Sequence, residues 1–307
     1  MGDKDTYSVP PLQQPHRHTF ILLHGRGSNG QSFGSGLVNS PLAPPTKASA
    51  KSEPHATAAA AAETLRTAFP HARFVFPTAP RTSVALYRGR ATHQWFDSWK
   101  LDPPATEREY LQAPGLGDTT RRLHALLESE IASVPGGAAS VVLGGLSQGC
   151  AAALVATLLW EGGRLGAVVG MCGWLPYAAR MSEEVKDALA SNGEGEDDIF
   201  ERGEDDRPRH RSKDPMTVAI TWLREELQLG TTSGPKSALT KSIPVFLGHG
   251  VQDARVNIIL GRTAGQCLSD LGADVTCVEY EALGHWYSPN MLRDMADFIW
   301  KETGWTP

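Results

Sequence analysis

The stretch from residue 140 to residue 160 constrains the fold more than any other part of the chain. Its first half holds Val-Val-Leu at 141–143, an apolar and mostly β-branched run of the kind found in buried parallel strands. Its second half, residues 150–160, contains no helix breaker and is long enough for about three turns of helix. Gly-Leu-Ser-Gln-Gly at 145–149 joins the two halves. The stretch therefore predicts a buried strand, a tight turn and a helix.

The turn places one serine between two glycines. In a strand-to-helix turn, Ser147 has to adopt a strained backbone conformation to project its hydroxyl above the sheet edge. Side chains at positions 145 and 149 would then collide with neighbouring backbone, and glycine removes that collision. A helix that begins at Gln148 also points free N–H groups toward the serine, where an oxyanion would develop. A glycine turn that contains a serine by chance has the same five-residue sequence. The interpretation as a nucleophile therefore depends on finding a base and a carboxylate elsewhere in the chain.

The alternation of strand and helix continues along the chain. Apolar or alternating runs predict strands at 19–23, 73–76, 141–143, 167–172, 244–248 and 274–280. Helical spacing or composition predicts helices at 56–69, 116–134, 150–160, 181–190, 259–271 and 292–299. Strands that alternate with helices form a mostly parallel sheet with helices on both faces, and ligands bind at the carboxyl ends of its strands.

Three segments stand apart from this pattern. Residues 1–18 are polar and predict an N-terminal arm, and low complexity marks insertions at about 34–62 and 191–240. The proline-rich part of the first insertion predicts a surface loop. The charged part of the second, 192–214, has few apolar residues to offset ordering entropy, which favours a mobile segment, with partner docking as the alternative. Residues 1–307 are interpreted as a single domain that includes the arm and both insertions.

Composition excludes several function classes. With 41% hydrophobic and 21% charged residues and a net charge of -5, the chain has no electrostatic footprint for nucleic acid or an anionic membrane. It contains no apolar stretch long enough to span a bilayer, and its N-terminus is unlike a signal peptide, which predicts a cytoplasmic protein. The four cysteines lack metal-ligand spacing and are interpreted as buried, reduced thiols. No metal or cofactor is expected.

Partners for the serine follow two later strands. Asp253 comes after the strand at 244–248, and His285 comes after the strand at 274–280. A serine hydroxyl needs a positioned base, and the base needs a carboxylate that fixes its tautomer. The order serine, aspartate, histidine is the order of the triad in α/β-hydrolases. We therefore expect Ser147, Asp253 and His285 to meet at one edge of the sheet.

Other acids and histidines fit less well. Asp97 and Asp102 precede the serine, and Glu279 and Glu281 lie too close to the end of the last strand to hold an imidazole in the following loop. His24 and His249 are each followed by glycine directly after a strand, and we expect both to have structural roles.

The loop after the first predicted strand is rich in glycine. His24-Gly25-Arg26-Gly27 lets the backbone turn sharply and present an N–H group. It lacks the Lys-Ser/Thr of a phosphate-binding loop and the spacing of a dinucleotide fingerprint. An oxyanion loop fits better. Further along, the aromatic cluster at 95–99 either closes the core or forms an apolar wall for an acyl chain.

At this point a resemblance becomes specific. Seven motifs in order make the chain similar to the acyl-protein thioesterase and lysophospholipase-like carboxylesterases, a family of α/β-hydrolases, from about Phe20 to Ile299. The motifs are Leu23-His24-Gly25, Pro77-x-Ala79-Pro80, Trp95-Phe96-Asp97, Gly145-Leu146-Ser147-Gln148-Gly149, Trp174-Leu175-Pro176, His249-Gly250-x-x-Asp253 and Gly284-His285.

The resemblance implies a role for each site residue. Ser147 would be the nucleophile, His285 the general base and then acid, and Asp253 the residue that orients the imidazole. The backbone N–H groups of Arg26 and Gln148 would form the oxyanion hole. The residues expected to bind substrate are Trp95, Phe96, Trp174, Leu175 and Trp286. The implied substrate is a small or lipid-like ester or thioester, or an acylated protein, and no cofactor is needed.

The chain also departs from the family's pattern. Arg26 stands where the family usually has leucine, and small residues are usual at the positions of Cys150 and Trp286. The Arg26 side chain is expected to reach the cavity mouth and favour an anionic substrate, and Trp286 to narrow the leaving-group side. These departures argue against assuming a lipidated protein as substrate. An acyltransferase with the same triad, or a non-catalytic binding protein with the same fold, are the alternatives.

Overall fold

The computed structural model describes residues 6–45, 62–190, 214–230 and 243–305. Parts of four sequence predictions lie outside these ranges. They are residues 1–5 of the N-terminal arm, 46–61 of the first insertion, 191–213 and 231–240 of the second insertion with its charged segment, and 56–61 of the helix expected at 56–69.

A single large sheet organises the described residues. Its seven strands have the order β1-β3-β2-β6-β7-β8-β9, in which β1 is antiparallel to β3 and all other neighbours are parallel. The strands are β1 (Thr6–Val9), β2 (His18–Leu23), β3 (Ala72–Pro77), β6 (Val141–Leu146), β7 (Ala167–Met171), β8 (Val245–Gly250) and β9 (Val275–Tyr280). The predicted parallel sheet is confirmed, and all six strands expected from the sequence are present.

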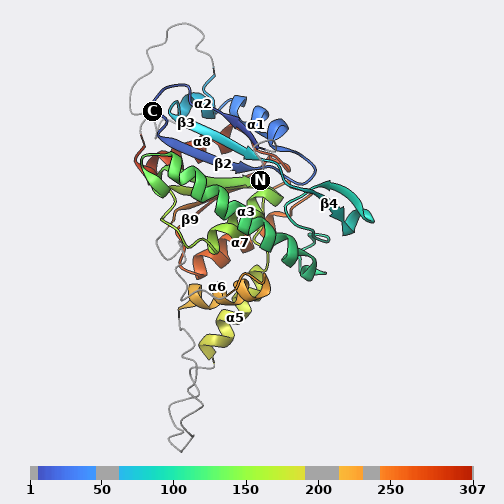
Figure 1. Ribbon diagram of the computed structural model, residues 1–307. Coiled ribbons are helices and arrows are strands. Elements are labelled where there is room, and N and C mark those ends of the chain that lie inside the picture. The colour runs from blue at the N-terminus through green and yellow to red at the C-terminus, as the bar shows by residue number, and fades with distance from the viewer. Residues whose placement is uncertain (1–5, 46–61, 191–213, 231–242, 306–307) are drawn as a thin grey trace, which may run out of the picture.

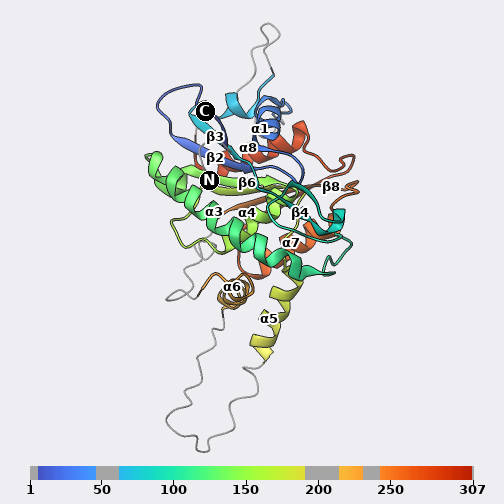
Figure 2. The same ribbon diagram turned by 45° about the vertical axis from the view of Figure 1, so that its right-hand side comes forward.

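Helices cover both faces of the sheet (Figure 1). One face packs against α1 (Gly30–Asn39), α2 (Leu65–Ala68) and α8 (Pro289–Thr303). The other packs against α3 (Gln112–Ser133), α4 (Gln148–Leu158) and α7 (Ile258–Asp270), with α5 (Ala178–Ala190) and α6 (Pro215–Glu226) beyond them. In Figure 2, α4 lies below β6, with α3 alongside it. Because both faces are covered, every residue of β6 is buried, which explains the continuous apolar run in the sequence.

The structure corrects three boundaries. The N-terminal arm is not wholly irregular, because Thr6–Val9 forms β1 and adds to the sheet edge. The first insertion does not begin as a loop, because α1 extends to Asn39. The second contains the helix α6, which is capped by the carboxylate of Asp214. The low-complexity sequence next to α1 and α6 made the helical spacing of both difficult to recognise. The polar hairpin of β4 (Arg81–Val84) and β5 (Arg90–His93) was also not predicted.

No helix in the described ranges is long and apolar enough to cross a membrane.

The turn between β6 and α4 requires glycine at position 149, where a side chain would collide with neighbouring backbone. A Cβ at Gly149 would lie 2.3 Å from the carbonyl oxygen of Leu23 and 2.7 Å from that of His24. Both are backbone atoms of β2 and its loop, so they have little freedom to move away.

We expect Gly149→Ala to lower the free energy of unfolding by about 3 kcal/mol despite the higher helix propensity of alanine. Urea unfolding followed by circular dichroism measures the change. Gly36→Ala in α1 is the matched control, because its Cβ would meet only the Tyr287 hydroxyl at 3.6 Å. The control should be neutral or slightly stabilising, and equal losses in both variants would contradict the packing argument.

Candidate active site

Ser147 occupies the strained turn that its sequence predicts. It caps α4 with φ 57° and ψ -120°, a positive φ that is unfavourable for a residue with a side chain. Its N–H donates to the carbonyl of Met171 at 2.8 Å, so neighbouring strand β7 holds the turn in place. The turn therefore fixes the position of the hydroxyl before any ligand arrives.

The three polar residues expected to meet do so. Nε2 of His285 lies 2.9 Å from Oγ of Ser147, and Nδ1 of His285 lies 2.7 Å from Oδ2 of Asp253. A carboxylate only accepts hydrogen bonds, so Nδ1 carries the proton and Nε2 is left to accept from the serine hydroxyl. The Asp253 side chain is fully buried, whereas the His285 side chain is 15% exposed.

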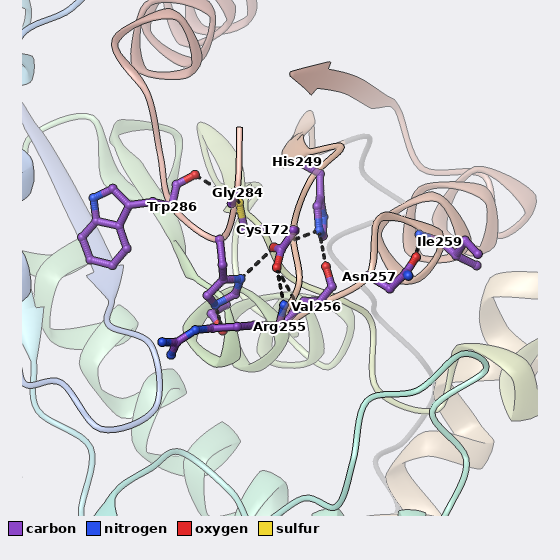
Figure 3. A network of polar contacts seen from close by, with 11 residues as sticks. Cys172, His249, Arg255, Val256, Asn257, Ile259, Gly284 and Trp286 are labelled. Carbon is purple, nitrogen blue, oxygen red and sulfur yellow. Dashed lines mark hydrogen bonds and ion pairs between the residues drawn. The ribbon is translucent and has the colours of Figure 1, made fainter. Parts of the chain in front are cut away.

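The carboxylate of Asp253 is held from several sides (Figure 3). Oδ1 accepts from the backbone N–H groups of Arg255 at 2.8 Å and Val256 at 2.9 Å. Burial by itself raises the pKa of this carboxyl, but hydrogen bonds from His249, His285 and the two N–H groups outweigh it and keep the pKa well below its usual range. Asp253 is therefore ionised at neutral pH.

His249 is a second histidine on the same carboxylate. Its Nε2 lies 2.8 Å from the carbonyl of Val256 and 3.3 Å from Oδ2 of Asp253. Both partners are acceptors, so Nε2 carries the proton. The residue is 5% exposed, and its ring packs against Gly261 of α7. The expected structural role of His249 thus includes holding the carboxylate.

Two backbone N–H groups are available beside the serine. Gln148 is the first residue of α4, where an N–H has no partner within the helix. The N–H of Arg26 has no hydrogen-bond partner among the described residues. Gly25 brings this loop close, because a Cβ there would lie 3.4 Å from Cβ of Ser147. These are the two N–H groups that the sequence predicts for an oxyanion hole.

The loop that carries Arg26 is anchored by His24. Its Nδ1 donates to the carbonyl of Gly25 at 2.7 Å, and its Nε2 accepts from the N–H of Ala79 at 3.0 Å. Burial lowers the pKa of His24 to about 4, so the ring remains neutral. His24 therefore shapes its loop rather than titrating near neutral pH.

Trp95 and Phe96 connect the glycine loop with the turn that carries Ser147. The Gln148 side chain accepts from the N–H of Trp95 at 3.0 Å and donates to the carbonyl of Phe96 at 2.7 Å. Nε1 of Trp95 donates to the carbonyl of His24 at 2.8 Å. These bonds join the nucleophile turn, the glycine loop and the aromatic segment into one rigid unit.

A cavity of about 370 Å³ opens over Ser147. Among the residues expected to bind substrate, it is lined by Trp174 and by Trp286, which is 51% exposed and stacks on Tyr287. Trp95, Phe96 and Leu175 are buried in the core and do not line it, which corrects their expected place. Cys150 also lies away from the cavity, and burial raises the pKa of its thiol to about 12.

Sequence reasoning missed much of the cavity wall. The additional side chains come from the β4–β5 hairpin, the segment after Trp95, helix α1 and the loop after Asp253. They are Phe33, Leu86, Tyr87, Trp99, Lys100, Leu101, Arg255 and Val256. The aromatic cluster at 95–99 was the available signal, since its third aromatic, Trp99, does line the cavity.

A parallel sheet with a serine on a strand-to-helix turn, joined to histidine and aspartate from later strand ends, defines an α/β-hydrolase of the serine esterase class. The family comparison is more specific. The model of the phospholipase/carboxylesterase family matches residues 52–197 and 227–303, and the chain belongs to this family of ester hydrolases.

Similar proteins agree with this assignment. The chain is 23% identical to acyl-protein thioesterase 1 of Gibberella zeae over 96% of this chain and 94% of the relative. It is 30% identical to the carboxylesterase SOBER1 of Arabidopsis thaliana over 61% of this chain and 73% of the relative. The crystal structure of Zea mays acyl-protein thioesterase 2 shares the fold, with a TM-score of 0.63 and 22% identity over 97% of this chain and 99% of that one.

Proposed function

We propose that this protein hydrolyses a carboxylic ester or thioester with an apolar acyl part through an acyl-enzyme on Ser147. The observation that carries the proposal is the continuous hydrogen-bonded series from Ser147 and His285, which line the cavity, to the buried Asp253. The apolar side chains of Phe33, Leu86 and Leu101 in the cavity wall favour an acyl chain.

In the first half of the reaction, Oγ of Ser147 attacks the carbonyl carbon and its proton passes to Nε2 of His285. The ionised Asp253 stabilises the resulting imidazolium. The N–H groups of Gln148 and Arg26 donate to the oxyanion of the tetrahedral intermediate. When the intermediate collapses, the same Nε2–H gives its proton to the departing alcohol or thiol, and the acyl group remains on Ser147.

In the second half, a water molecule takes the place of the leaving group. His285 accepts a proton from the water as it attacks the acyl-enzyme, and returns the proton to Oγ of Ser147. The acid is released and the site is restored. An alcohol or amine that enters in place of water would make the protein an acyltransferase.

Covalent labelling tests this proposal. A fluorophosphonate should attach to the peptide that contains Ser147, as read by mass spectrometry, and ester hydrolysis should stop in proportion. A series of 4-nitrophenyl esters and matched thioesters should show kcat/KM rising with acyl length until the cavity is filled, by up to about fourfold for each methylene. Product analysis with added alcohol separates hydrolysis from acyl transfer. Labelling at another residue would overturn the proposal.

A further inference from the structure

The cavity over Ser147 is lined by three cationic side chains. Arg26, Lys100 and Arg255 all contribute to its wall, whereas its lining includes no aspartate or glutamate. The whole chain carries a net charge of -5, so this local excess of positive charge opposes the overall balance. A uniform surface charge would repel anions from this protein, but the cavity attracts them over a distance of about a Debye length.

The guanidinium of Arg26 is held in the cavity wall by contacts with two neutral side chains. One Nη donates to the hydroxyl of Ser98, and the group lies 6.0 Å from the ring centroid of Tyr87. Its Nε is buried without a hydrogen-bond partner, and within the described residues no carboxylate forms an ion pair with it. A partly buried cation with unused donors is costly unless an anion joins it. Two neutral contacts fix the position of this group and leave its charge uncompensated.

Arg255 approaches from the opposite loop. Its backbone N–H donates to Oδ1 of Asp253, which fixes the start of the side chain beside the triad. In Figure 3 the Arg255 side chain extends away from His249, toward the side where Trp286 lies. Lys100 is exposed at the rim. Neither Arg255 nor Lys100 has an ion-pair partner among the residues that the structure describes, and both residues contribute to the cavity lining.

We propose that the substrate is an anionic ester or thioester, with a carboxylate or phosphate group that Arg26, assisted by Arg255 and Lys100, binds inside the cavity. This inference rests on the proposed function, since it names the substrate class of the same site. Guanidinium groups bind both anions through paired N–H donors. The anion would contribute binding energy next to the reacting carbonyl, and salt would weaken that contribution.

A purely structural role for Arg26 makes a different prediction. If the side chain serves only to hold Ser98 and Tyr87, its loss lowers the rate for charged and neutral substrates alike. If it binds the anion, its loss changes the ratio between them. The ratio of kcat/KM values for a matched pair of substrates is therefore the informative measurement.

Matched esters provide that ratio. The first pair is the mono-4-nitrophenyl ester of adipic acid and 4-nitrophenyl hexanoate, which differ only in a terminal carboxylate. A second set is phenyl hexanoate with its 3-carboxy and 3-phosphonooxy derivatives, which place a carboxylate or a phosphate on the leaving group. Each is assayed in low and high salt with the intact protein and with Arg26→Met, Arg255→Gln and Lys100→Met. Arg90→Met, at an exposed position on β5 outside the cavity lining, is the control.

We expect about a tenfold or greater preference for the anionic member of at least one set, lost in high salt and reduced about tenfold by Arg26→Met. Arg255→Gln, at an exposed position that tolerates substitution, should reduce it less, and Arg90→Met should retain it. The set that shows the preference identifies where the anion lies. Equal rates for charged and neutral esters in every set, or a preference that survives Arg26→Met, would overturn the inference while leaving the esterase proposal intact. Failure to hydrolyse the neutral esters as well would instead reject the proposed function.

Discussion

Replacing Ser147 by alanine is expected to lower kcat for a chromogenic ester by about a millionfold and to abolish fluorophosphonate labelling. Alanine keeps the Cβ and the strained backbone at this position but removes the atom that bonds to the acyl group. The residual rate would come from the oxyanion donors acting on a bound ester with water as nucleophile. Discontinuous assays measure the ratio of the two kcat values. Ser147→Ala is assayed at high protein concentration, and the wild type is diluted until both form product at comparable rates.

The variant should remain folded, because the described contacts of the Ser147 hydroxyl consist of one hydrogen bond to His285. Circular dichroism and thermal unfolding verify this. Ser182→Ala is the matched control, since this α5 hydroxyl donates to the carbonyl of Ala178 and lies outside the cavity lining. It should keep wild-type kcat and full labelling. Hydrolysis by Ser147→Ala at a rate near that of the wild type would refute the acyl-enzyme mechanism.

The sequence predicted the parts of this fold that are buried on both sides. Residues 141–146 lie between two helical layers, so all of their side chains are apolar or absent, and the pattern is visible without the structure. The same strands determine the site. His285 lies 138 positions from Ser147 and 32 from Asp253, yet the rule that parallel strands end at one edge brings the three together.

The residues that line the cavity could not be predicted from the hydrophobic pattern of the sequence. Trp95 is aromatic and precedes a loop, which suits a substrate wall and a core contact equally well. Its place is decided by hydrogen bonds to Gln148 and His24, which lie 53 and 71 positions away. Likewise, α6 has apolar side chains at Met216, Ile220 and Leu223, but the charged sequence before it obscures the helical spacing. Side chains placed by such distant or isolated contacts leave no periodic signal.

Asp253→Asn tests the orienting role of the carboxylate with little change of shape. Two backbone N–H donors, from Arg255 and Val256, hold Oδ1, so the amide oxygen of asparagine should remain there. The NH₂ group must then take the place of Oδ2 and face His285. An NH₂ group donates, so Nδ1 of His285 has to accept, and the proton moves to Nε2. In this tautomer His285 presents a proton to Ser147 and is unable to remove one.

We therefore expect Asp253→Asn to lower kcat about ten-thousandfold while fluorophosphonate labelling becomes correspondingly slow. His249 reinforces the effect, because its Nε2–H lies 3.3 Å from the replaced atom and would face another donor. Asp97→Asn is the control. Its carboxylate accepts from the backbone N–H groups of Ala85 and Ser98, away from the triad, so kcat should change far less. If instead Asp97→Asn abolished activity and Asp253→Asn did not, the triad would have been assigned the wrong acid. Circular dichroism of both variants at the assay temperature separates a lost tautomer from a lost fold, since only the former leaves the native spectrum unchanged.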